Sequence, residues 1–181
     1  ENLMQYAKAR GLPVDFLNYH MFGEPATFES HKERVDGMKQ WLKENGFSEN
    51  TPLYPGDWTV WSDAYPADYL DTSYVSSYII GSLFNMARAG IQWHSHDLDV
   101  KDDRLERRII DQRGKDAQFI GDWPIFTRDN ILKPAYNAFT ALSIFAGKRE
   151  AQIPSQLEIS SADDYFVTAA ASQTKDKRTT R

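Results

Sequence analysis

The residues best suited to chemistry form the stretch 52–61, PLYPGDWTVW, in which one carboxylate stands among aromatic rings. Asp57 lies beside Trp58, and Tyr54 and Trp61 add two further rings. A sugar ring has apolar C–H faces edged with hydroxyl groups, so flat aromatic side chains around one acid suit a sugar site. The alternative interpretation is a strand that ends in a Gly-Asp turn, with the aromatic rings in the core.

A second group of candidate residues is the His-x-His pair formed by His94 and His96, with Asp97 directly after it. On a strand this spacing places both imidazoles on one face. It is acceptable spacing for a metal site, for which His20 and Asp57 could supply further ligands. A metal-dependent hydrolase is therefore one alternative. Sugar hydrogen bonding or a structural role is the preferred interpretation, so we assign no metal and expect no cofactor.

The elements expected to position these residues alternate between helices and strands. The predicted helices cover residues 3–9, 27–46, 65–90 and 132–145, and the predicted strands cover 14–20, 53–58 and 91–97. This rhythm indicates parallel strands with right-handed crossovers, as in a doubly wound sheet or a (β/α)8 barrel. In both folds the site lies at the carboxyl ends of the strands, so His20, Asp57 and Asp97 should share one mouth. His31 is expected on a solvated helix face.

Composition bounds the class of protein. The chain has 181 residues, 41% of them hydrophobic, a net charge of −5 and no cysteine. An acidic chain of this kind suits a globular protein that does not bind nucleic acid, and neither disulfides nor thiolate metal sites can form. No apolar run is long enough to cross a bilayer. Residues 1–4 read as the middle of the helix that closes after Ala9, and the pattern turns strand-like from Ile153, so we expect a segment of a longer chain.

With these residues in view, the chain resembles the C-terminal half of a glycoside hydrolase family 39 barrel, the family of β-xylosidases and α-L-iduronidases. Residues 14–20, VDFLNYH, look like strand six, and residues 93–97, WHSHD, look like strand eight. Residues 119–127, FIGDWPIFT, and 133–139, KPAYNAF, resemble the family's Gly-rich loop and last helix. The likeness covers residues 10–147.

The resemblance implies strands six to eight of a (β/α)8 TIM barrel in residues 1–150 and the start of a β-sandwich domain in residues 151–181. It also implies a retaining O-glycosidase that acts on a β-xyloside or, second, an α-uronide. Strand seven of the family ends Thr-Glu-Trp with the glutamate as nucleophile, and this chain has Asp57 at that position, one methylene shorter. The general acid is expected upstream of Glu1, in an Asn-Glu pair ending strand four.

Sugar contacts around Asp57 are expected from both aromatic and polar side chains. Trp58 and Trp93 would stack on the sugar, and Asp97 would accept hydrogen bonds from ring hydroxyls. The full set implied for substrate binding is His20, Trp58, Trp93, His96, Asp97 and Trp123. The expected partners are a carbohydrate and the rest of the same barrel, at the cell surface or outside the cell. A barrel that binds carbohydrate without catalysis is the main alternative.

Overall fold

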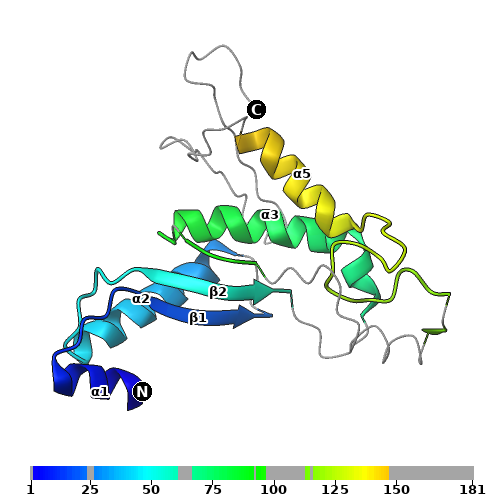
Figure 1. Ribbon diagram of the computed structural model, residues 1–181. Helices are drawn as coiled ribbons and strands as arrows, with labels where there is room; N and C mark the ends of the chain where they lie inside the picture. The colour runs from blue at the N-terminus through cyan, green and yellow to red at the C-terminus, as the bar shows by residue number, and fades with distance from the viewer. Residues whose placement is uncertain are drawn as a thin grey trace, which may run out of the picture. The chain divides into compact units, whose positions relative to one another are not determined.

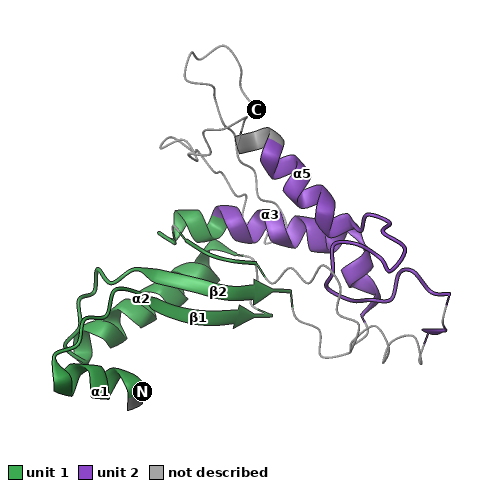
Figure 2. Cartoon of the chain, viewed as in Figure 1, with its two compact units in different colours: residues 1–61, 85–97 green, residues 62–84, 98–181 purple. Residues whose placement is uncertain are grey.

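The computed structural model describes residues 2–23, 27–60, 67–91, 93–96, 113–114 and 116–146. The chain divides into two compact units, one formed by residues 1–61 with 85–97 and the other by residues 62–84 with 98–181 (Figure 2). Each unit is described by itself below. Trp61, Asp97 and the predicted β-rich domain at 151–181 lie outside the described residues.

The first unit contains two helices and two strands: α1 (Asn2–Arg10), β1 (Leu17–Phe22), α2 (Phe28–Glu44) and β2 (Leu53–Thr59) (Figure 1). The strands pair in parallel, from Leu17 opposite Leu53 to Phe22 opposite Thr59. The predicted strand–helix–strand order with parallel strands is therefore confirmed for these elements. β1 begins three residues later than predicted and continues two residues further.

Helix α2 begins where the sequence places it. The hydroxyl of Thr27 accepts a hydrogen bond from the Ser30 N–H at 3.2 Å, which satisfies one of the unpaired donors of the first turn. The buried stripe of α2 carries His31, Val35 and Leu42, which lie four and seven residues apart on one face. The expectation that His31 is solvated is wrong, because this spacing places it 1% exposed on the apolar side.

The third predicted strand is also wrong for the residues that the structure describes. Ile91 and residues 93–96 form no strand. The segment nevertheless lies against β2, because the Ser95 N–H donates to the Pro55 carbonyl at 3.0 Å and the Ser95 hydroxyl donates to the Gly56 carbonyl. A side chain thus takes the place of the next backbone donor, and a regular ladder does not form there.

The second unit contains a short 3-10 helix, η1 (Asp68–Asp71), most of α3 (Ser73–Arg88) and α5 (Pro134–Ala146). The single helix predicted over 65–90 is divided at Thr72. Its hydroxyl donates to the Tyr69 carbonyl at 2.7 Å and accepts from the Tyr74 N–H at 3.3 Å, so it closes η1 and starts α3.

Helix α5 begins at Pro134. Proline suits the first turn because it has no N–H, and an N–H at that position would find no acceptor within the helix. The prediction began this helix at Leu132. That residue instead forms an isolated antiparallel bridge with Phe126.

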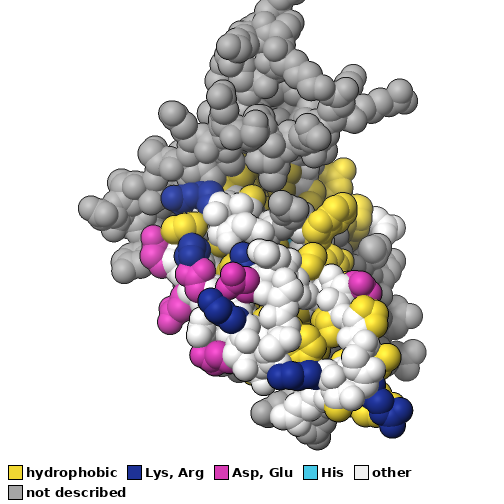
Figure 3. Space-filling model, turned by 90° about the vertical axis from the view of Figure 1, so that its left-hand side faces the viewer, with side chains coloured by type: hydrophobic (Ala, Val, Ile, Leu, Met, Phe, Trp, Pro, Cys, Tyr) yellow, Lys and Arg dark blue, Asp and Glu magenta, His cyan; other side chains and the backbone are white. Residues whose placement is uncertain are grey.

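The surface at the α1 end of the first unit mixes charged and apolar side chains (Figure 3). Leu3 is 77% exposed, Phe16 is 57% exposed and Tyr6 is 52% exposed. None of the helices in the described ranges is long and apolar enough to cross a membrane.

Candidate functional site

The centre of the candidate site is the pair formed by His20 and Asp57. These residues are direct partners in the β1–β2 register, and His20 Nδ1 lies 3.8 Å from Asp57 Oδ2. Their side chains are 64% and 29% exposed, so both reach solvent. At this distance the two groups attract each other by charge when the imidazole is protonated, but they do not form a hydrogen bond.

A β-bulge in β2 determines which face Asp57 occupies. Tyr19 pairs with Pro55 and His20 pairs with Asp57, so Gly56 is an extra residue between two consecutive pairs. In a regular strand Asp57 would share a face with the buried Pro55, because side chains alternate between faces. The bulge resets this alternation and places Asp57 on the open face of the two-stranded sheet.

The same bulge places Trp58 in the core. Trp58 is 0% exposed, and its register partner Met21 is 1% exposed. Its indole meets the His94 and His96 rings in T-shaped contacts at centroid distances of 5.7 and 4.5 Å. No ring face of Trp58 is open to a sugar in this structure, so the indole is a core residue rather than a stacking surface.

Both imidazoles of the His-x-His pair contact Trp58, although residues 93–96 do not form the predicted strand. His94 keeps contact with solvent, while desolvation by the surrounding protein lowers its pKa from the usual 6.5. Within the described residues no group of three or more histidine or acidic side chains could hold a metal ion. The two imidazoles therefore do not gain further ligands from His20 and Asp57.

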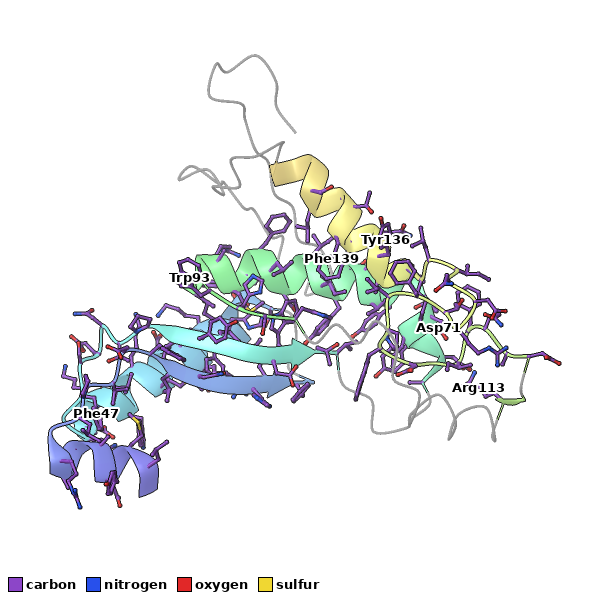
Figure 4. All side chains as sticks on the ribbon, viewed as in Figure 1. Phe47, Asp71, Trp93, Arg113, Tyr136 and Phe139 are labelled. Carbon is purple, nitrogen blue, oxygen red and sulfur yellow. The ribbon has the colours of Figure 1, made fainter. Side chains whose placement is uncertain are left out.

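Among the predicted aromatic contacts, Trp93 is the one with a widely open ring, at 69% exposure. It lies on the segment after α3 (Figure 4) and precedes Ser95, the residue bonded to β2, by two positions. Trp123 belongs to the second unit, where it is half-buried. Asp97 lies outside the described residues.

Asp57 has one oxygen that the described structure does not use. Its Oδ1 is buried and has no hydrogen-bond partner within the described ranges, while Oδ2 faces His20. A buried carboxylate oxygen without a donor costs folding free energy. Because Oδ1 is buried while the side chain as a whole is 29% exposed, the Oδ2 side of the carboxylate is the side that could meet a ligand or attack an electrophilic carbon.

A second acid, Asp71 at the end of η1, was not identified by the sequence. Its Oδ2 accepts a hydrogen bond from the Gly121 N–H at 2.6 Å. Its Oδ1 lies 2.6 Å from Lys133 Nζ, in an ion pair whose alignment is not that of a good hydrogen bond. Lys133 also donates to the Asp122 carbonyl, and the two charged side chains are only 10% and 3% exposed. Figure 4 shows Asp71 beneath the start of α5.

This buried ion pair joins η1 to the Gly-Asp-Trp-Pro loop and to Lys133, which directly precedes α5. Gly121 has a φ of +69°, and a Cβ there would lie 2.7–2.9 Å from backbone atoms of Ala67. The Ala67 N–H donates to the Gly121 carbonyl at 3.2 Å. The signal that could have revealed Asp71 is the apolar setting of Lys133, because a buried lysine requires an acidic partner.

The structure resembles solved enzymes. A GH39 beta-xylosidase from Caulobacter crescentus matches with a TM-score of 0.61 at 19% identity, over 97% of this chain and 34% of that one. A GH39 enzyme from Xanthomonas axonopodis pv. citri matches with a TM-score of 0.58 at 21% identity, over 81% and 30%. A glucosidase from Croceicoccus marinus matches with a TM-score of 0.67 at 18% identity, over 97% and 33%.

The chain spans about a third of the length of these structures. No family model matches the sequence, and no curated protein matches it significantly. At these identities the likeness concerns the fold, and at that level it supports the resemblance to family 39.

Proposed function

We propose that this chain is part of a glycoside hydrolase that cleaves O-glycosidic bonds, with Asp57 at the position of the catalytic nucleophile. The observation that carries the proposal is the open carboxylate beside His20, near the end of a parallel strand, in a fold like that of GH39 enzymes. Residues 1–150 would belong to a (β/α)8 barrel, and residues 151–181 would begin a β-rich domain.

In a retaining reaction Asp57 would attack the anomeric carbon and form a glycosyl-enzyme intermediate, which water then hydrolyses. A second carboxyl group, about 5 to 5.5 Å away, must protonate the leaving group and later activate the water. We expect it in the Asn-Glu pair of an earlier strand. His20 would orient the Asp57 carboxylate or bind a sugar hydroxyl, since its ring is exposed beside it.

The remaining contacts follow from what each side chain exposes. Trp93 would stack on the apolar face of the sugar, because its ring is open to solvent. His96, Asp97 and Trp123 remain candidates for binding hydroxyl groups or framing the substrate. Trp58 would contribute by supporting the strand beneath Asp57 rather than by touching the sugar. A β-xyloside is the first substrate to test, followed by a β-glucoside and an α-uronide.

The test uses the full-length protein that contains this chain and a panel of aryl glycosides. We expect cleavage by the parent protein and loss of cleavage in Asp57→Ala. Azide can enter the space of the missing carboxylate, so added azide should restore turnover and yield a glycosyl azide. Asp36→Ala is the matched control, because Asp36 lies on the exposed side of α2 in a pair with Lys32.

The second candidate is a barrel that binds carbohydrate without cleaving it. The observation that favours it is the aspartate at Asp57, whose side chain reaches one methylene less far than glutamate. If no aryl glycoside is cleaved while calorimetry detects an oligosaccharide that binds, the second candidate replaces the first. Binding should then weaken in Trp93→Ala, because a sugar that is bound without being cleaved would still stack on this open aromatic ring.

A further inference from the structure

The space beside the bulged residue of β2, Gly56, is filled by a neighbouring side chain. A Cβ built on Gly56 would lie 2.2 Å from Asn18 Oδ1 and 2.6 Å from Asn18 Nδ2. Both distances are far shorter than real carbon contacts. The exposed side chain of Asn18 on β1 therefore packs its carboxamide against Gly56, and a residue with a Cβ at position 56 would have to displace either this carboxamide or the bulged peptide.

The opposite side of the bulge is held by Ser95. The extra residue of a bulge leaves backbone groups outside the strand ladder, and buried backbone groups need partners. The Ser95 N–H donates to the Pro55 carbonyl at 3.0 Å, and the Ser95 hydroxyl donates to the Gly56 carbonyl. One residue thus bonds the two carbonyls directly before Asp57.

Asp57 depends directly on this arrangement. It follows Gly56 in the chain, so a rotation of the bulged peptide moves its Cα and carboxylate. The carboxylate has few other restraints, because Oδ2 lies 3.8 Å from His20 and Oδ1 has no hydrogen-bond partner in the described part of the chain. The bulge is therefore the main restraint on Asp57 that the described residues provide.

We infer that Asn18, Gly56 and Ser95 are positioning residues that set the carboxylate of Asp57 for reaction. This inference rests on the proposed function. A displacement of about 1 Å at a reacting group can cost about a hundredfold in rate. The three residues act through Asp57 and do not themselves need to touch the substrate.

The test compares Gly56→Ala, Asn18→Ala and the double variant in the full-length protein. Gly56→Ala should lower kcat about tenfold to a hundredfold with KM changed less than about threefold, because the new Cβ displaces the Asn18 carboxamide from the bulge or shifts the bulged peptide itself. Adding Asn18→Ala removes the three side-chain atoms that the Cβ would meet, so the double variant should regain at least half of the logarithmic loss. Gly37→Ala is the control, because a Cβ there meets nothing within 4 Å.

The inference is overturned if Gly56→Ala keeps kcat within twofold of the parent, or if the double variant is no better than Gly56→Ala. A crystal structure of Gly56→Ala separates this outcome from failure of the proposed function. If the parent cleaves no glycoside but His20 Nδ1 and Asp57 Oδ2 move apart from 3.8 Å by more than about 1 Å, the positioning role stands and the proposed activity fails. An unmoved carboxylate overturns the inference whatever the activity.

Discussion

Asp57 and Asp71 are two acids of one chain in opposite surroundings. Asp57, in the first unit, has a buried oxygen without a partner within the described residues and reaches solvent through the rest of its side chain. Asp71, in the second unit, is 10% exposed and meets both Lys133 and the Gly121 N–H. An acid that is buried against a lysine and a backbone N–H holds the fold, whereas an acid that reaches solvent and has no buried cation beside it among the described residues is a candidate for chemistry.

Replacing Asp71 by asparagine should produce the largest loss of stability. The change leaves the Lys133 ammonium buried without its counter-charge, which costs about 3–5 kcal/mol. Urea unfolding of the full-length protein measures this free energy. The matched control is Asp36→Asn, which breaks the exposed Lys32–Asp36 pair and should cost about 1 kcal/mol or less.

The double variant Asp71→Leu/Lys133→Met sharpens this prediction. It removes both charges together, so it should recover most of the stability that Asp71→Asn loses. Equal losses in Asp71→Asn and Asp36→Asn would contradict the structural role of the buried pair.

Acid should destabilise the first unit through His31. Burial lowers the pKa of His31 from 6.5 to about 4, so the folded protein holds this imidazole neutral. The unfolded chain binds a proton at higher pH than the folded chain does. The free energy of unfolding is therefore unaffected by His31 above about pH 6.5. It decreases as the pH falls toward 4, by about 3 kcal/mol in total.

The measurement for His31 is the free energy of unfolding between pH 4 and 7.5, compared between the parent and His31→Leu. Both ring nitrogens are buried without a hydrogen-bond partner in the described ranges, so leucine should be tolerated at neutral pH. The difference between the two proteins should grow in favour of leucine as pH falls. A difference that stays constant with pH would show that the imidazole is not held neutral.

Two glycines with positive φ offer the smallest contrast. Gly121→Ala places a Cβ within 2.7–2.9 Å of the Ala67 backbone, whereas Gly90→Ala, at φ +92°, meets nothing within 4 Å. Both substitutions strain a left-handed backbone by about 1–2 kcal/mol, and the first adds overpacking of about 2 kcal/mol. Thermal unfolding should therefore separate the two variants. Equal melting temperatures would mean that the loop containing Gly121 moves freely away from Ala67.

The sequence predicted elements that depend on local pattern. The helical spacing of Val35 and Leu42, the Thr27 cap and the apolar start of β2 at Leu53 all appear in the structure. Periodicity and capping are properties of neighbouring residues, so they can be read from one stretch of chain.

The sequence failed where the outcome depends on distant residues. Strand alternation alone places Trp58 outward and Asp57 inward, and the bulge at Gly56 reverses both. The residues next to Gly56 in the sequence do not indicate the bulge, because the residues that contact it, Asn18 and Ser95, lie elsewhere in the chain. The partner of Lys133 was missed for the same reason, because long-range pairs leave no local pattern.

The most direct test of the contrast between the two acids measures kcat and melting temperature for Asp57→Asn and Asp71→Asn side by side in the full-length protein. We expect Asp57→Asn to lose at least about a thousandfold in kcat and to keep its melting temperature. We expect Asp71→Asn to melt well below the parent but, at a temperature where it is folded, to retain kcat within about threefold. Retained activity in Asp57→Asn, or loss of activity in folded Asp71→Asn, would contradict the assignment of Asp57 to chemistry and of Asp71 to the fold.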